Sequence, residues 1–410
     1  MAIRVVVSLL SGRHVSVEIS ADAKISSLRC RSASELGARL CALASPWGGL
    51  LRDADTLAEA GVKDGDTLTA IARHTDVLMS RGACAKLLSD GSVETRGRKD
   101  YGGDSSSVQE RLRDVHQLQA TKYAFAALLE DGSVVTWGHP LRGGDSRAVQ
   151  EQLKGVKQIQ ATNLAFAAIC YNGSVVTWGD DFSGGDSSFL QGELQNVEKI
   201  QANDFSFAAI RSDGSVVTWG SLHSGGDCSV VREDLRHVEH VQSSEGAFAA
   251  ICANGSAVAW GNPHFGGDSS CVRDELTNVH QIQSTDAAFA AIRVDGSVVT
   301  WGEGFSGGDS TAVRQKLTEV QKIQANGSAF AAIRADGSVV TWGEAVCGGD
   351  CSSVAGQLSG VQEIQASSGA FAALRRDGTV VSWGRPECGG SDMFAAVLAD
   401  GSVVTWSKSQ

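Results

Sequence analysis

One short sequence recurs at a fixed interval along most of this 410-residue chain. The glycine of an (Asp/Asn)-Gly-(Ser/Thr) triplet falls at Gly91, Gly132, Gly173, Gly214, Gly255, Gly296, Gly337 and Gly378. Neighbouring glycines of this series lie 132 − 91 = 41 residues apart, and a ninth, Gly401, follows after only 401 − 378 = 23. A period near 40 residues predicts one supersecondary unit copied in tandem, each copy burying its face against the next.

The third copy predicts three strands, at residues 158–161, 165–169 and 175–178. The second and third of these are apolar on both faces, which is typical of strands buried between two layers. Asn172-Gly173 predicts a type I′ hairpin turn between them.

A helical turn is expected after the third strand. Gly184-Gly185 predicts a bend, and Asp186 is expected to cap a helix rather than to bind calcium. The apolar residues that follow are spaced as on one helix face. They are Leu190, Leu194, Val197 and Ile200.

A tryptophan ends the third strand of nearly every copy. We expect these residues to fill the core, because a buried tryptophan hides a large apolar area. They are Trp137, Trp178, Trp219, Trp260, Trp301, Trp342, Trp383 and Trp406.

The repeat resembles those of the regulator of chromosome condensation family. The shared pattern runs I-Q-A-x-x-x-x-F-A-A-(I/L)-x-x-(D/N)-G-S-V-V-T-W-G, over about residues 75–406. The resemblance implies a mainly β fold in which the 41-residue repeats form a seven- or eight-bladed propeller. An open β-solenoid is the alternative, because these copies are shorter than the family's four-stranded blades and the family's G-x-x-H is replaced here.

The first 73 residues lie outside the repeat. Alternating apolar residues at 3–7 and 15–19 predict a hairpin, residues 34–43 a helix begun by Ser34, and residues 67–71 a last strand. Residues 51–68 resemble the ubiquitin-like signature L-x-D-x-x-T-L-x-x-x-x-(I/V)-x-x-x-x-T-L. We therefore expect a ubiquitin-like β-grasp domain at 1–73 and the repeat array at 74–410. No di-glycine ends the first domain, so it is expected to be a fixed docking module.

Bulk composition excludes several classes of protein. The formal net charge of −12 makes direct nucleic-acid binding unexpected, since such a field repels phosphates. No apolar run is long enough to span a membrane. The ten cysteines lack metal-site spacing and are expected to be reduced thiols of an intracellular, cytoplasmic or nuclear protein. No cofactor, metal or catalytic motif is expected.

Candidate contact residues come from positions at which the copies differ. One such position is the segment after each Trp-Gly pair, and a second includes 122–123, 163–164, 204–205 and 286–287. Loops at one end of a propeller form its usual binding surface. The residues expected to be exposed there are Tyr101, Leu141, Arg142, Phe182, His264, Phe265 and Phe305. The alternative is neutral variation of unconstrained loops. In the first domain, Trp47 is either an exposed anchor or a lid on the small core.

These features favour a non-enzymatic scaffold or adaptor that binds a protein through its loops and docks to ubiquitin-pathway machinery. Regulation of nucleotide exchange on a small GTPase is an alternative implied by the repeat family, although no blade carries an inserted wedge. An ultraviolet-B photoreceptor is another, although only Arg73-His74-Thr75 matches a fragment of its G-W-R-H-T motif. A ubiquitin-ligase role would require a catalytic domain that this sequence lacks.

Overall fold

The computed structural model describes residues 2–9, 13–36, 40–72, 76–88, 90–385, 394–397 and 403–406. These residues are mainly β and divide into two compact units, Met1–His139 and Pro140–Gln410. The first unit holds an N-terminal domain and the sheets of the first two repeats, and the second unit holds the remaining sheets. The boundary expected between residues 73 and 74 lies outside the described residues, so it stays a prediction.

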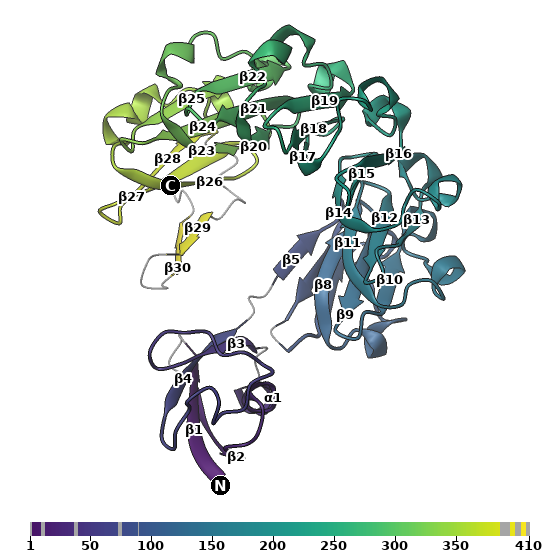
Figure 1. Cartoon of the computed structure of the whole chain (residues 1–410), viewed down its shortest axis with the longest axis vertical. Helices are drawn as coiled ribbons and strands as arrows, with labels where there is room; N and C mark the ends of the chain where they lie inside the picture. Colours follow the sequence, from purple (N-terminus) through teal and green to yellow (C-terminus); the bar gives the residue numbers. More distant parts are fainter. Residues whose placement is uncertain are drawn as a thin grey trace. The chain divides into compact units, whose positions relative to one another are not determined.

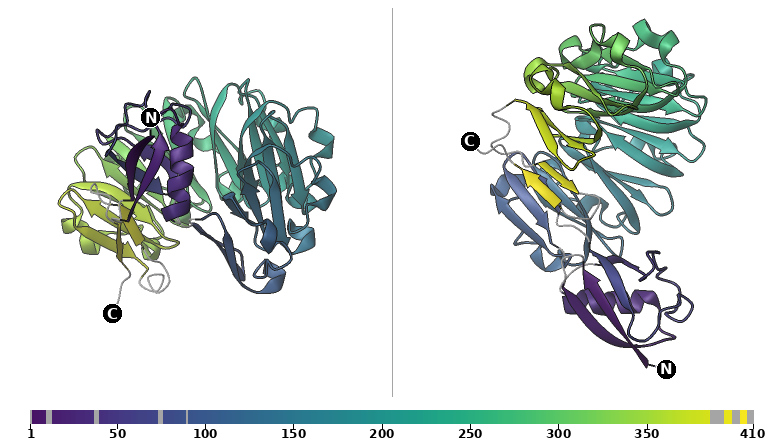
Figure 2. Two further views of the ribbon diagram at one scale, coloured as in Figure 1. Left: turned by 90° about the horizontal axis from the view of Figure 1, so that it is seen from below. Right: turned by 90° about the vertical axis from the view of Figure 1, so that its left-hand side faces the viewer.

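The N-terminal domain is a β-grasp. Its sheet has the strand order β2-β1-β4-β3, with β1 antiparallel to β2 and parallel to β4. Figure 2 shows α1 lying across one face of this sheet. The elements are β1 (Ala2–Leu9), β2 (His14–Ser20), α1 (Ile25–Leu36), β3 (Leu40–Ala44) and β4 (Thr67–Ala72).

The position predicted for the helix of this domain is wrong. The helix spans Ile25–Leu36, because Ile25, Leu28 and Leu36 form its buried face against the sheet. Ser34 therefore lies inside the helix and does not begin it. Residues 40–43, predicted to be helical, belong instead to β3, which pairs with β4. The predicted hairpin and last strand are confirmed.

Each repeat forms one three-stranded antiparallel sheet, and Figure 1 follows these sheets along the chain. The first strands are β5 (Asp76–Met79), β8 (Val115–Ala120), β11 (Val156–Ala161), β14 (Val197–Ala202), β17 (Val238–Ser243), β20 (Val279–Ser284), β23 (Val320–Ala325) and β26 (Val361–Ala366). The second strands are β6 (Ala83–Leu87), β9 (Ala124–Leu129), β12 (Ala165–Cys170), β15 (Ser206–Arg211), β18 (Ala247–Cys252), β21 (Ala288–Arg293), β24 (Ala329–Arg334) and β27 (Ala370–Arg375). The third strands are β7 (Val93–Gly97), β10 (Val134–Gly138), β13 (Val175–Gly179), β16 (Val216–Gly220), β19 (Ala257–Gly261), β22 (Val298–Gly302), β25 (Val339–Gly343) and β28 (Val380–Gly384). A last pair, β29 (Phe394–Val397) and β30 (Val403–Trp406), follows.

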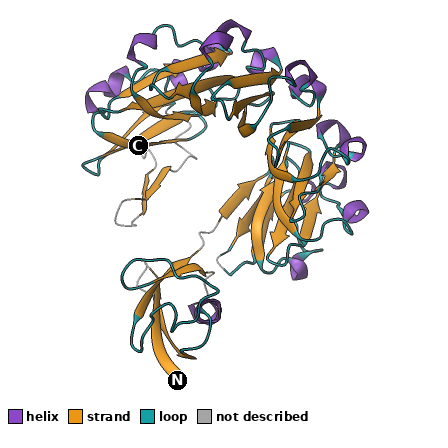
Figure 3. Cartoon of the chain, in the orientation of Figure 1, coloured by secondary structure: helices purple, strands orange, loops and turns teal. Residues whose placement is uncertain are grey.

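Two series of short helical turns follow the third strands. In Figure 3 they lie, in purple, along the outer side of the sheets in the second unit. The first series is η1 (Lys99–Tyr101), η3 (Pro140–Arg142), η5 (Asp181–Ser183), η7 (Leu222–Ser224), η9 (Pro263–Phe265), η11 (Gly304–Gly308) and η13 (Ala345–Cys347). The second is η2 (Gln109–Arg111), η4 (Arg147–Val149), η6 (Ser188–Leu190), η8 (Ser229–Val231), η10 (Ser270–Glu275), η12 (Arg314–Lys316) and η14 (Ser352–Gln357).

The hairpin turn differs from the predicted type I′ form. Type I′ needs a positive φ at two central residues, but only Gly173 has one, at +79°. The Gly173 amide donates to the Cys170 carbonyl, and the Cys170 amide donates to the Ser174 carbonyl. This is a three-residue loop with its glycine in the left-handed region. The Asn172 side chain accepts hydrogen bonds from the Ser174 amide and hydroxyl, which explains the recurring triplet.

Apolar cores lie between consecutive sheets. Ala165, Ala167 and Ile169 of one sheet pack against Phe207 and Trp219 of the next. The Trp219 indole also donates to the Gly184 carbonyl of the preceding repeat, at 3.1 Å. Of the predicted helical stripe, Leu190 ends a short turn, whereas Val197 and Ile200 lie on β14. A strand suits them better because both side chains then join this inter-sheet core.

The mainly β class, with tandem three-stranded sheets, is confirmed. Within the described residues, every sheet of the array takes its strands from consecutive positions of one repeat. A ring closed by exchange of strands would contain one sheet with strands from both ends of the array. The observed pairing therefore agrees with the open-solenoid alternative.

Candidate functional site

The first helical turn is held in place at its third residue in six repeats. In these, a side chain that precedes the second strand donates to the main-chain carbonyl of that residue. Thr162 donates to Ser183 at 3.1 Å, Ser244 to Phe265 at 2.7 Å and Asn326 to Cys347 at 2.7 Å. These donors are buried, so each turn is fixed to its sheet.

The middle residue of each of these turns points into solvent. Phe182 is 87% exposed, Phe305 is 85% exposed and Leu141 is 77% exposed. The equivalent positions in the other turns are also exposed. We call this set the exposed row; it comprises Leu141, Phe182, His223, His264, Phe305 and Val346, one residue from each of six consecutive turns. It places large apolar side chains on fixed backbone, an arrangement suited to contact with a protein surface.

Three residues predicted to be exposed are half-buried instead. Tyr101, Arg142 and Phe265 are the third residues of their turns, and third residues face the sheet. Tyr101 stacks on Tyr123 with ring centroids 5.0 Å apart, and Phe265 packs against an inter-sheet core. The prediction of exposure for these three is therefore wrong by one position along the turn.

The repeat tryptophans lie in the cores. The seven from Trp137 to Trp383 are each at most 6% exposed, and each stacks on a phenylalanine of its own sheet. The side chain of Trp406 lies outside the described residues. The Trp47 side chain is 63% exposed in the loop after β3. This exposure is expected of an anchor and not of a lid on the core.

Further exposed apolar residues were not anticipated, and three of them lie in the helical turns. Leu222 begins η7, Phe189 lies in η6 and Val230 lies in η8. Their exposed fractions are 71%, 74% and 96%. Phe189 and Val230 share a repeat position with Ala148, so variation between copies was the signal that could have identified them.

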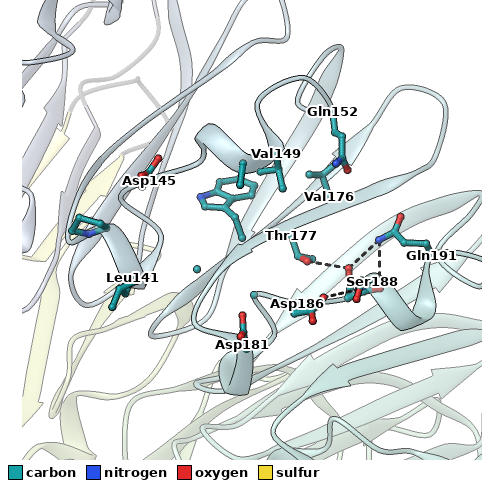
Figure 4. Close-up of a pocket in the computed structure, with 16 residues that line it drawn as sticks. Leu141, Asp145, Val149, Gln152, Val176, Thr177, Asp181, Asp186, Ser188 and Gln191 are labelled. Carbon is teal, nitrogen blue, oxygen red and sulfur yellow. Dashed lines mark hydrogen bonds between the residues drawn. The ribbon is translucent and has the colours of Figure 1, made fainter.

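A groove of about 590 Å³ lies beside β13. Figure 4 shows the residues around it, with Leu141 and Val149 from the second repeat and Thr177, Asp186 and Gln191 from the third. The groove therefore adjoins the exposed row at Leu141.

The second variable position, which includes residues 204–205 and 286–287, lies between the first and second strands of each repeat. Its main-chain groups form a column of hydrogen bonds through successive repeats. The Asp204 amide donates to the Glu245 carbonyl, the Glu245 amide to Asp286 and the Asp286 amide to Gly327. Burial raises the pKa of the Asp286 carboxyl, and the negative charge of Asp204 raises it further. The column thus holds one carboxylate in an unfavourable environment.

Replacing Asp286 with asparagine should raise the melting temperature at pH 7 and leave it unchanged near about pH 3. A carboxyl whose folded pKa is raised adds stability below its unfolded pKa, and that stability is lost as the pH rises through the folded pKa. Asparagine removes this loss. Thermal denaturation at both pH values checks the expectation, and an equal change in melting temperature at both would contradict it.

The rest of the described chain offers few reactive groups. Burial raises the pKa of the Cys170, Cys228 and Cys252 thiols, which makes them less nucleophilic. Within the described ranges, no group of three or more histidine, cysteine, aspartate or glutamate side chains is placed to hold a metal ion. Among the helices of these same ranges, none is long and apolar enough to cross a membrane.

No family model and no curated protein sequence matches the chain. Several solved structures are similar to it. Prp20p of Saccharomyces cerevisiae, the yeast RCC1, is 19% identical over 60% of this chain and 75% of its own, with a TM-score of 0.37. The ectodomain of the Physcomitrella patens receptor kinase CR4 is 15% identical over 72% of this chain and 76% of its own, with a TM-score of 0.38. The ubiquitin-like domain of Plasmodium falciparum Dsk2 is 25% identical over 18% of this chain and 100% of its own, with a TM-score of 0.16.

Proposed function

We propose that this chain is a non-enzymatic interaction scaffold whose exposed row binds a protein partner. The observation that supports this most is the pairing of exposed apolar side chains with turns fixed by buried hydrogen bonds. The backbone that carries these side chains is already ordered before binding, so this chain loses less conformational entropy when a partner binds. The β-grasp domain would dock separately to ubiquitin-pathway machinery, with Trp47 as its anchor.

Serine at Phe182, Phe305 and Val346 together should abolish recovery of a partner that the unaltered chain captures. The three side chains are exposed, so their loss should change the melting temperature by little. Pull-down and thermal denaturation of the same preparations measure both effects. Retained capture by the triple variant would contradict a role for the exposed row.

The docking role of the β-grasp domain has its own test. Trp47→Ala in the full chain should reduce binding to ubiquitin-pathway proteins without changing partner capture by the repeats. Equal binding by both chains would contradict Trp47 as the anchor.

A second candidate function is regulation of a small GTPase. Prp20p of Saccharomyces cerevisiae has binding properties toward Gsp1p and histones. An assay of nucleotide release from a Ran-type GTPase separates this function from scaffolding, because a scaffold leaves the release rate unchanged.

The photoreceptor alternative is weaker. It requires exposed tryptophans at an interface, whereas Trp137 to Trp383 of the repeats are buried. Arg73, His74 and Thr75 lie outside the described residues.

A further inference from the structure

Two arginines lie against a pair of stacked tyrosines in the first unit. With a neighbouring lysine they form a set that we call the basic surface, which comprises Arg81, Arg98, Tyr101, Lys122 and Tyr123. The two tyrosine rings stack with centroids 5.0 Å apart. The Arg98 guanidinium lies over the Tyr101 ring, 4.5 Å from its centroid, and the Arg81 guanidinium reaches the Tyr123 hydroxyl at 3.5 Å. Because an aromatic face attracts a guanidinium, the tyrosine pair positions these cations.

The backbone that carries the two arginines is fixed around Gly82. Arg81 precedes this glycine in the chain, and the Arg98 amide donates to the Gly82 carbonyl at 2.9 Å. A Cβ at Gly82 would lie 3.3 Å from a side-chain carbon of Arg98 and 3.3 Å from a ring carbon of Tyr101. The Ser80 hydroxyl donates to the Tyr101 carbonyl at 2.8 Å. The loop that holds Arg81 and the turn that follows Arg98 are therefore bonded to each other.

Arg98 lacks the structural task that this repeat position has in other copies. In the third copy the equivalent residue, Asp180, accepts a hydrogen bond from the third amide of the helical turn, and Glu303 does the same in the sixth. An arginine cannot accept such a bond, and Arg98 makes no side-chain cap. Among the eight copies, only the first has arginine both at this position and at that of Arg81. The pair is thus not explained by the repeat itself.

Both guanidinium groups are open to further contacts. Arg81 and Arg98 are exposed, and within the part of the chain that the structure describes neither forms an ion pair. Beside them lies a hollow of about 570 Å³, lined by Ser80, Arg81 and Lys122. Arginine binds carboxylate and phosphate groups through paired N–H donors. The basic surface is therefore suited to oxyanions.

The charge of the whole chain limits the kind of anion that fits. The formal net charge is −12, so the chain repels a long run of phosphates such as a nucleic acid. A few cations on an otherwise acidic chain suit a short segment with separate negative groups. An acidic stretch of a protein has this character.

We propose that the basic surface docks an acidic segment of a partner protein, whose carboxylate or phosphate groups pair with the guanidinium groups of Arg81 and Arg98. The surface shares no residue with the exposed row. The inference therefore goes beyond the proposed function and does not depend on it.

The probe is a fluorescein-labelled peptide of eight residues that alternates glutamate and serine, and fluorescence anisotropy measures its binding to the full chain. Arg81→Gln together with Arg98→Gln should weaken binding at least about tenfold. Arg111→Gln together with Arg113→Gln is the matched control, because it removes the same charge from two exposed arginines that precede β8, whereas Lys122 follows this strand. At about 0.15 M salt, interactions over more than about 8 Å are largely screened. The control chain should therefore bind as the unaltered chain does.

Two further peptides test the chemistry of the segment. One has glutamine in place of glutamate and should not bind. The other has glutamine in place of glutamate and phosphoserine in place of serine; its affinity relative to the glutamate peptide tells whether phosphate or carboxylate groups are preferred. Absence of binding by both acidic peptides, equal binding of the neutral peptide, or equal loss in the two pairs of arginine variants would overturn the proposal.

Two controls separate binding from folding and from the exposed row. All four arginines are exposed, so their replacement should change the melting temperature by little. The chain with serine at Phe182, Phe305 and Val346 should bind the glutamate peptide as the unaltered chain does. Loss of peptide binding by that chain would assign the peptide to the exposed row and overturn the proposal, whereas retained binding supports it whether or not the protein partner is lost.

Discussion

Alanine at Gly184 should destabilise the chain by about 2–5 kcal/mol, through left-handed backbone strain and an overpacked core together. Gly184 has a φ of +90°, and a Cβ there would lie 2.7 Å from a ring carbon of Phe207 and 3.1 Å from Trp219. Both rings belong to the next repeat and are buried, so neither has room to move.

Gly192→Ala is the matched control. A Cβ at Gly192 meets nothing within 4 Å, and its φ is not in the left-handed region. Alanine there should leave stability unchanged or raise it by up to about 1 kcal/mol. Urea denaturation of both variants gives the comparison, and equal midpoints would show that Gly184 is not a point of close contact between repeats.

Trp219→Ala should cost about 3–5 kcal/mol, as expected for removal of a large buried aromatic side chain. Trp219 is 1% exposed, stacks on Phe207 with ring centroids 5.1 Å apart and donates to the Gly184 carbonyl. Trp219→Phe should lose less stability than Trp219→Ala. It retains an aromatic ring and gives up mainly the hydrogen bond, which contributes about 1 kcal/mol.

Trp47→Ala serves as the contrast for Trp219, since Trp47 is 63% exposed. Its effect on stability should be small. Chemical denaturation of the three tryptophan variants measures the series. A loss at Trp219 no larger than that at Trp47 would contradict a packing role for the repeat tryptophans.

The 41-residue period predicted the repeat well because several of the shared residues make contacts within their own copy. The triplet residues Asn172 and Ser174 bond within one turn, and Phe166 and Trp178 stack within one sheet. Contacts of this kind depend on short separations in the sequence, so the pattern alone reveals them.

The errors came from features that depend on neighbouring elements. Val197 and Ile200 have helical spacing from Leu194, but they lie on a strand because the next sheet needs their side chains. Phe182 and Ser183 are adjacent, yet only Phe182 is exposed, because the carbonyl of Ser183 is held by Thr162. No periodicity distinguishes these two positions.

The groove beside β13 could not be predicted for the same reason. Its lining joins Leu141 and Val149 of one repeat to Thr177 and Asp186 of the next. The sequence indicated that copies pack together, but it did not indicate which loop of one copy faces the edge strand of another.

The central claim is that partner binding belongs to the exposed row and not to exposed apolar residues in general. Tyr171 and Val294 provide the comparison, because they are 78% and 75% exposed in the hairpin turns that precede the third strands. The measurement is the affinity of the captured partner for two chains, one with serine at Phe182, Phe305 and Val346 and one with serine at Tyr171 and Val294. We predict loss of binding in the first and full binding in the second, with equal melting temperatures. Full binding by the first chain, or equal loss in both, would contradict the claim.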